Sequence, residues 1–221
     1  MKMKKFFVLL FILATSSVVN AQIVITTPYE FSAGVSSGAT FSSVSFSPKV
    51  TQSMLLGATI GLTGRMTMGK NVGMQIELNY VQQGWKENYD ELPDYLYSRR
   101  IDYFQFPFYT HIQFGGKNVK GFINAGPQIG YMIGESTKHE PNGDLSNKVI
   151  RQHDMPVEKK FEWGISGGAG IEIRTGIGYF LLEGRYLYSL GDIYNTTRSD
   201  YFTKASGQTI TAKVSYLIPL K

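Results

Sequence analysis

The sequence has no cysteine among its 221 residues. This absence excludes disulfide bonds, thiolate metal sites, a cysteine nucleophile and the lipid-bearing cysteine of a lipoprotein. Charged residues are also few, at 18%, whereas hydrophobic residues make up 43%. A chain with this balance has enough apolar surface to fold, so the composition argues against disorder of the whole.

Long apolar runs are missing as well, apart from one near the N-terminus. Residues 6–14 (FFVLLFILA) are uninterrupted apolar residues preceded by three lysines. The run is shorter than the ~20 residues that a membrane-spanning helix needs. The pattern Val-Asn-Ala at residues 19–21 is typical of a secretory cleavage site. We therefore predict a signal peptide over residues 1–21 and an exported mature domain over residues 22–221.

The excess of positive charge belongs mainly to this leader. The full sequence carries 22 basic and 17 acidic residues. Three of the basic residues, Lys2, Lys4 and Lys5, lie in the predicted leader, which leaves 19 basic residues against 17 acidic ones. The mature chain is thus nearly neutral and lacks the electrostatic footprint of a nucleic-acid-binding protein. We expect no nucleic-acid partner.

Helical periodicity is scarce after the leader, and apolar residues alternate with polar ones instead. The alternation predicts strands over residues 30–36, 55–66, 73–85, 101–114, 121–133, 161–174, 179–190 and 207–218. Short connections with turn residues, at 67–72, 115–120 and 175–178, alternate with long polar ones at 37–54, 86–100, 134–160 and 191–206. This order is typical of an up-and-down barrel whose two ends differ.

Each predicted strand has one apolar and one polar face. A soluble barrel turns the apolar face inward, whereas a membrane barrel turns it outward toward lipid. Three features favour the membrane: glycines on the polar face that suit a narrow lumen, charges on that face that can pair, and aromatic residues near both strand ends. The expected belts are Tyr80, Trp85, Tyr103, Tyr131, Trp163, Tyr186 and Tyr188 at the long-connection end, and Phe114, Phe122, Tyr179, Phe180 and Tyr216 at the other.

The sequence therefore predicts an all-β fold, an eight-stranded up-and-down antiparallel transmembrane β-barrel in the outer membrane. Closure leaves no unpaired strand edge in lipid. Eight strands enclose a lumen that side chains can fill, so we expect no general diffusion pore. We expect the luminal charges to form a buried network of Glu77, Glu172, Glu183, Arg65, Arg185 and Lys213.

Five segments in order resemble a known family. They are residues 74–84 (MQIELNYVQQG), 103–107 (YFQFP), 125–131 (AGPQIGY), 167–172 (GGAGIE) and 183–186 (EGRY). Over essentially the whole mature chain, the sequence resembles the small outer-membrane β-barrels of Bacteroidetes called PorT-like or "porin family". The resemblance implies an eight-stranded outer-membrane barrel with periplasmic termini and brings no enzymatic activity. Such barrels usually end in an aromatic residue, whereas residues 218–221 here read Ile-Pro-Leu-Lys.

Candidate sites for chemistry are few. Of the three histidines, His111 is predicted to face the lumen, and His139 and His153 lie in the connection 134–160. They show no recurrent ligand spacing, so we expect no metal and no cofactor. The long connections carry residues that often dominate contact surfaces: Tyr95, Tyr97, Arg99, Arg100, Tyr201 and Phe202. An equal alternative is that these aromatic residues extend the belt and the arginines meet lipopolysaccharide phosphates.

The sequence-based prediction of function is a non-enzymatic, monomeric barrel with a closed polar lumen and long extracellular loops. Its role is expected to be structural or interactive: adhesion, envelope integrity, or a component of an envelope or secretion complex. Expected partners are outer-membrane lipid and lipopolysaccharide, the barrel-assembly machinery during biogenesis, and an envelope protein that the sequence does not name. The alternatives are a lipid A-modifying enzyme and a narrow channel for small solutes.

Overall fold

The computed structural model describes residues 29–89, 92–140, 151–196 and 200–220 of the chain. Within these ranges, the side chains of residues 88, 89, 92–95, 140 and 151 are not described. The predicted signal peptide, residues 1–21, lies outside the described residues.

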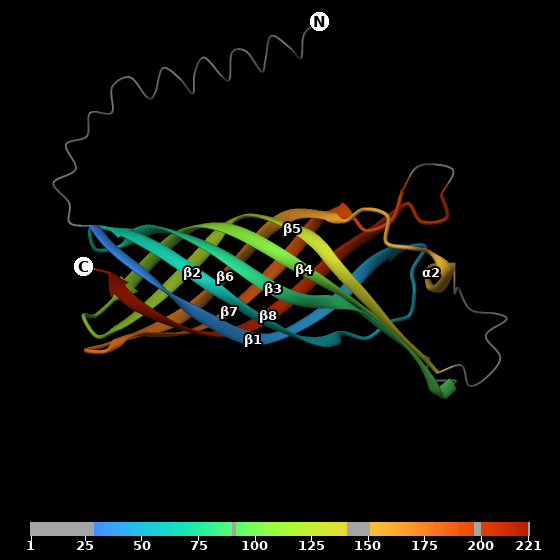
Figure 1. The fold of residues 1–221 in the computed structure, drawn as a ribbon, viewed down its shortest axis with the longest axis horizontal. Coiled ribbons are helices and arrows are strands. Elements are labelled where there is room, and N and C mark those ends of the chain that lie inside the picture. Colours follow the sequence, from blue (N-terminus) through green and yellow to red (C-terminus); the bar gives the residue numbers. More distant parts are fainter. Residues whose placement is uncertain (1–28, 90–91, 141–150, 197–199, 221) are drawn as a thin grey trace, which may run out of the picture.

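Eight antiparallel strands form one closed barrel in which each strand pairs with the next and β1 pairs with β8 (Figure 1). The strands are β1 (Tyr29–Ser47), β2 (Leu55–Met68), β3 (Val72–Tyr89), β4 (Leu92–Gly115), β5 (Val119–Glu140), β6 (Phe161–Thr175), β7 (Gly178–Asp192) and β8 (Lys204–Leu220), with a short helix α2 (Arg151–Asp154) between β5 and β6. The predicted fold class is confirmed.

The two ends of the barrel differ, as predicted. The connections β2–β3, β4–β5 and β6–β7 are two or three residues long and share one end with Tyr29 and Leu220. We call this the turn end, and it lies on the left in Figure 1. The strand ends that flank the other four connections lie at the opposite end together with α2, and we call this the loop end.

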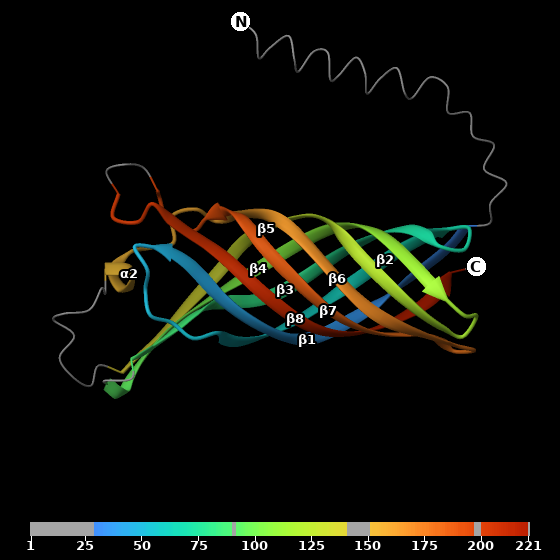
Figure 2. The same ribbon diagram turned by 180° about the vertical axis from the view of Figure 1, so that it is seen from behind.

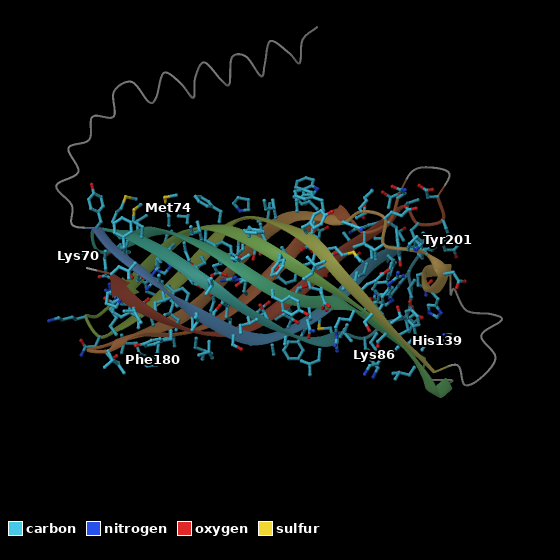
Figure 3. All side chains as sticks on the ribbon, in the orientation of Figure 1. Lys70, Met74, Lys86, His139, Phe180 and Tyr201 are labelled. Carbon is cyan, nitrogen blue, oxygen red and sulfur yellow. The ribbon has the colours of Figure 1, made fainter. Side chains whose placement is uncertain are left out.

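The outer wall of the barrel is apolar and its interior is polar, because alternate residues of each strand point to opposite faces. The predicted alternation of an apolar and a polar face is confirmed in the strands. Exposed outward-facing residues include Val35, Leu62, Ile76, Leu78, Phe106, Phe108, Ile123, Ile129, Ile165, Ile171, Leu182, Val214 and Ile218. Figure 3 shows Met74 and Phe180 projecting outward from this wall. Such an inverted arrangement suits a barrel surrounded by hydrocarbon.

Several strands run further toward the loop end than predicted. β1 continues to Ser47, β4 begins at Leu92, and β5 continues to Glu140. The predicted long connections at 37–54, 86–100 and 134–160 are therefore wrong in extent, since much of each is strand. Beyond the apolar wall both faces of a strand can be polar, so the alternation that marks a strand in the sequence fades there. Figure 2 shows β4 and β5 running past most of the barrel, and β3 pairs beside β4 as far as Tyr89 and Leu92.

Among the described residues, no helix is long and apolar enough to cross a membrane.

Candidate functional site

The middle of the lumen holds a cluster of four charged side chains, Glu77, Glu183, Arg185 and Lys213, which we call the central charge cluster. Arg185 on β7 donates to both carboxylate oxygens of Glu77 on β3, at 2.8 and 2.9 Å. It also donates to Glu183 at 2.8 Å. Lys213 on β8 donates to Glu77 at 2.7 Å. All four are buried, so the cluster crosses the lumen and ties β3 to β7 and β8.

Neighbouring polar groups complete the hydrogen bonding of this cluster. Gln75 and Asn79, which flank Glu77 on the same face of β3, donate to its two oxygens at 2.7 and 2.8 Å. Asn124 donates to Glu183 at 3.0 Å. The guanidinium of Arg185 lies over the ring of Tyr109, 4.6 Å from its centroid. Buried charges that are paired and hydrogen-bonded in this way are tolerated inside a protein.

The other two predicted network residues lie in a separate cluster near the turn end. Arg65 on β2 pairs with Glu172 on β6 at 2.6 Å. Arg174 also pairs with Glu172, at 2.5 Å, and with Glu30 on β1, at 3.2 Å. The six predicted residues thus form two groups rather than one. Sequence reasoning did not include Arg174 and Glu30, although Glu172 and Arg174 lie two residues apart on one strand face.

His111 lies between the two groups, as a luminal residue. Its Nδ1 is 2.7 Å from Asn124 Oδ1, and its Nε2 is 3.4 Å from Arg65 Nη1. Because Asn124 also bonds Glu183, the histidine connects the central charge cluster with the turn-end cluster. A structural role for this histidine follows from these contacts.

Nearer the loop end, a buried carboxylate is surrounded by neutral donors. Glu162 on β6 accepts hydrogen bonds from Gln105 at 2.6 Å, from Ser189 at 2.8 Å and from Gln83 at 3.2 Å. Gln83 is itself bonded by Thr209. Each of these groups lies on a different strand. Sequence reasoning did not single out Glu162, since its neutral partners come from distant segments.

Among the described residues, these layers enclose a small cavity. A cavity between the central charge cluster and Glu162, lined in part by Asn79, Gln105, Arg185 and Lys213, has a volume of about 20 Å³. A cavity needs roughly 10–15 Å³ of such volume to hold one water molecule. The cavity thus has room for about one water and is too small for a solute.

The mouth of the barrel at the loop end is filled by an aromatic plug, which we define as Phe46, Trp85, Tyr97, Tyr194 and Phe202. Phe46 lies 5.3 Å from Trp85 and 5.1 Å from Phe202, centroid to centroid. Tyr194 stacks on Phe202 at 5.9 Å. All five side chains are buried and belong to one hydrophobic core. The plug therefore closes the mouth with the kind of packing found inside soluble proteins.

Polar groups hold α2 and the following residues over this plug. Arg99 donates to the carbonyls of Gln152 and Met155, at 3.2 and 2.6 Å, and pairs with Glu135 at 2.8 Å. Glu87 accepts from Trp85 Nε1 at 3.1 Å and from Gln152 at 2.8 Å.

A histidine and a tyrosine pack together beside Glu87. His153 lies 2.7 Å from Glu87 and stacks on Tyr97 at 3.6 Å. Burial raises the pKa of Tyr97 to about 12. The tyrosine is therefore neutral at physiological pH and serves as packing.

The prediction of an exposed contact surface is wrong for three of its residues. Tyr97, Arg99 and Phe202 are buried in the plug and its polar border. Tyr201 remains on the surface, Arg100 is half-buried, and the side chain of Tyr95 lies outside the described part of the chain. Extended strands carry the odd-numbered residues of β4 inward, which the sequence did not reveal because the segment was expected to be a loop.

The predicted aromatic belts also need correction. Trp85 and Tyr103 at the loop end, and Phe122 and Tyr179 at the turn end, are buried inside the barrel. Each is one of the inward-facing residues of its strand. A position near a strand end does not by itself determine the direction of a side chain. Exposed aromatic residues remain at both ends, namely Phe104, Tyr131, Phe161, Trp163 and Tyr186 at the loop end and Phe31, Phe114 and Phe180 at the turn end.

Within the part of the chain that the structure describes, no group of three histidine, aspartate or glutamate residues is arranged to hold a metal ion.

The family to which the chain is matched agrees with this architecture. A family model described as "Outer membrane protein beta-barrel domain" matches residues 20–195. A search of curated proteins returns no match. Among solved structures, the chain is similar to OprG of Pseudomonas aeruginosa, at 12% identity and a TM-score of 0.47, covering 86% of this chain and 95% of that one. It is also similar to Ail of Yersinia pestis, at 14% identity and a TM-score of 0.39, covering 86% and 99%.

Removal of the central cation should destabilise the barrel. In Arg185→Ala, Glu183 loses its paired cation and Glu77 keeps Lys213 as its one cationic partner, so we expect a loss of about 3–5 kcal/mol in the free energy of unfolding. Urea titration of the barrel in lipid vesicles measures this value. The control Lys138→Ala, at an exposed position of β5, should stay within about 0.5 kcal/mol. A loss below about 1 kcal/mol for Arg185→Ala would indicate a hydrated lumen.

The two tryptophans should report different surroundings. Trp85 is fully buried in the plug, whereas Trp163 is 49% exposed on the outer wall. In Trp163→Phe, the remaining Trp85 should resist quenching by both acrylamide and brominated lipids. In Trp85→Phe, the remaining Trp163 should be strongly quenched by brominated lipids. Quenching of Trp85 by acrylamide to the level of free indole would show that the mouth is open.

Proposed function

This chain belongs to the outer membrane protein beta-barrel domain family, and on that premise we propose that it is a closed, non-enzymatic outer-membrane barrel that binds a protein partner through its loop end. Its role is structural or interactive, in adhesion, envelope integrity or an envelope complex. The barrel acts as a monomer that holds a protruding sheet at the cell surface. The observation that carries this proposal is the contrast between a blocked lumen and strands that extend beyond the apolar wall.

The blocked lumen argues against transport as the main role. Four groups of side chains fill successive levels of the interior. From the turn end they are the cluster around Glu172, the central charge cluster, Glu162 with its neutral donors, and the aromatic plug. A solute would have to displace several buried ion pairs to pass, and breaking one such pair costs about 3–5 kcal/mol. The interior is therefore better suited to holding the barrel rigid than to conduction.

The protruding sheet offers a strand edge at the loop end. The pairing of β5 with β6 ends at Tyr131 and Phe161, yet β5 continues to Glu140. Over residues 134–140, β5 pairs with β4 on one side. No strand among the described residues pairs with its other side there. An edge of this kind can accept a further strand from another chain.

Thr137 directs its backbone toward this edge. Gln113 on β4 donates its N–H to Asn71 near the start of β3 at 2.7 Å, so odd-numbered residues of β4 face β3 and even-numbered ones face β5. The bonded pair is then Arg100 with Ser136, and the next residue of β5, Thr137, faces the other way. Its N–H is available to a strand that lies beside β5.

The chemistry of the edge indicates the kind of partner. Ser136, Thr137 and Lys138 are exposed and polar, and Figure 3 shows His139 at the same protruding end. An extended segment of a partner protein can add to such an edge through main-chain hydrogen bonds. The proposed partner is thus a protein with an exposed, polar β-strand or extended loop.

A proline at the edge should prevent this binding. Thr137→Pro removes the N–H that faces the partner, and a proline is tolerated at a sheet edge. We expect about a tenfold loss of partner cross-linked and co-purified from intact cells. The matched control Thr137→Ala keeps the N–H and should capture as much partner as the wild type. Equal capture by both variants would contradict the use of this edge.

Conductance separates the proposal from a channel. The purified barrel in planar bilayers should give no stable conductance above the lipid baseline, because ion pairs and the plug occupy the lumen. A stable, large conductance would favour the narrow channel instead. The remaining alternative, a lipid A-modifying enzyme, requires altered lipid A masses on overproduction, and unchanged mass spectra would exclude it.

A further inference from the structure

A groove of about 870 Å³ runs along the outer wall, where β1 to β4 lie side by side. It combines small residues with large apolar ones: Ala33, Gly34 and Gly64 with Leu62, Phe106 and Phe108. A second groove of about 590 Å³ shares Val35, Leu62 and Leu78 with it and reaches Tyr80 and Phe104. The wall is therefore hollowed from the loop-end aromatic residues into the apolar band.

Pro107 lines this groove and interrupts the β3–β4 ladder. The register pairs Asn79 with Gln105 and Ile76 with Phe108, and the intervening Glu77 and Leu78 have no paired residue on β4. The same register sets Pro107 opposite Glu77. Like Gln113, Pro107 is an odd-numbered residue of β4 and faces β3, but proline has no N–H to donate. The carbonyl of Glu77 therefore lacks its ladder donor.

The backbone of Glu77 is the part of that residue that reaches the groove. Glu77 lines the groove and is 5% exposed as a residue. Its side chain is 0% exposed, enclosed by Arg185 and Lys213. The accessible atoms thus belong to the main chain. In hydrocarbon, a backbone polar group without a partner is costly, so a donor supplied from outside would stabilise this site.

We propose that the groove binds a hydroxylated acyl chain of an outer-leaflet glycolipid, with the chain hydroxyl donating to the Glu77 carbonyl. The occupant must be apolar along its length, because the groove walls are apolar, and must carry one donor. The 3-hydroxyacyl chains of lipid A have this chemistry. Their hydroxyl lies a few carbons below the headgroup, and its approach from the loop-end side rests on the proposed function, which puts the loop end at the cell surface.

The position of Glu77 suits such a chain. It lies three residues before Tyr80 on β3, roughly 10 Å along the strand. Tyr80 packs edge-on against Phe104, with centroids 6.3 Å apart, where the adjoining groove begins. A chain that enters beside these two rings can follow the hollow toward Pro107.

The test compares two probes on the barrel in phosphatidylcholine nanodiscs: 3-hydroxytetradecanoic acid and tetradecanoic acid, supplied at equal concentration. Native mass spectrometry counts the acid that each barrel retains. Because a hydrogen bond contributes about 1 kcal/mol, the wild type should retain the hydroxy acid about fivefold more than the plain acid. Purified lipid A, added as a competitor, should displace the hydroxy acid.

Three variants distinguish the hydrogen bond from the groove. Pro107→Ala restores an N–H for Glu77 and should remove the preference for the hydroxy acid while the plain acid is still retained. Gly64→Leu fills the groove and should reduce retention of both acids. A Cβ at Gly64 meets only Ile76, at 3.6 Å, which is an ordinary van der Waals contact. The control Gly184→Leu, on the outer wall of β7 with nothing within 4 Å, should behave as the wild type.

Each variant is first checked for the heat-modifiable gel migration of a folded barrel. Equal retention of the two acids by the wild type would overturn the proposed hydrogen bond. Unchanged retention in Gly64→Leu would overturn the groove as the binding site. If two copies of the chain cross-link through position 64, and the cross-linked pair retains neither acid, the occupant of the groove is a second copy. That result would also overturn the proposal.

Discussion

Inside hydrocarbon there is no water to bond a peptide group, so each N–H and C=O of a spanning strand needs a partner within the protein. The rest of the structure follows from this constraint. It requires the ring to close, which β1 and β8 achieve by pairing from Phe31 with Leu220 to Ser47 with Lys204. It makes the outer wall apolar and sends the polar side chains inward. It also makes Pro107 conspicuous, because a single missing N–H leaves the carbonyl of Glu77 without a ladder partner.

The interior meets a second demand, since charges that face inward have little water around them. The structure answers with groups in which each charge is paired or hydrogen-bonded by several neighbours. Arg185 and Lys213 both serve Glu77, whereas Glu162 is held by neutral amides and a hydroxyl. These contacts join strands on opposite sides of the ring, so they fix its cross-section as well as fill it. A lumen built in this way is a packed core made of polar groups.

The sequence predicted the number of strands, their order and which of their apolar side chains face outward along the middle of the strands, because lipid on one side imposes a strict alternation. Glu77, Arg185 and Lys213 were identifiable since charges on an otherwise apolar strand must face inward. The division into two charge clusters was not predictable, because it depends on the height at which strands far apart in sequence meet. The plug was missed for a related reason: near Trp85 and Arg99 the outer face is polar, so the lipid-imposed pattern stops. Tyr97 and Phe202 then resemble loop residues although they are core residues.

The aromatic plug has a consequence for how the ring is locked. Phe46 comes from β1, the first strand, and Phe202 lies just before β8, the last, and their rings are 5.1 Å apart. They meet beside the β1–β8 ladder, which joins the first strand to the last. This ladder forms only when the whole domain is present. Trp85 and Tyr194 then pack on the same rings. The plug therefore stabilises the closure of the barrel: its side chains are buried against one another, and this hydrophobic burial at the loop end keeps β1 and β8 together.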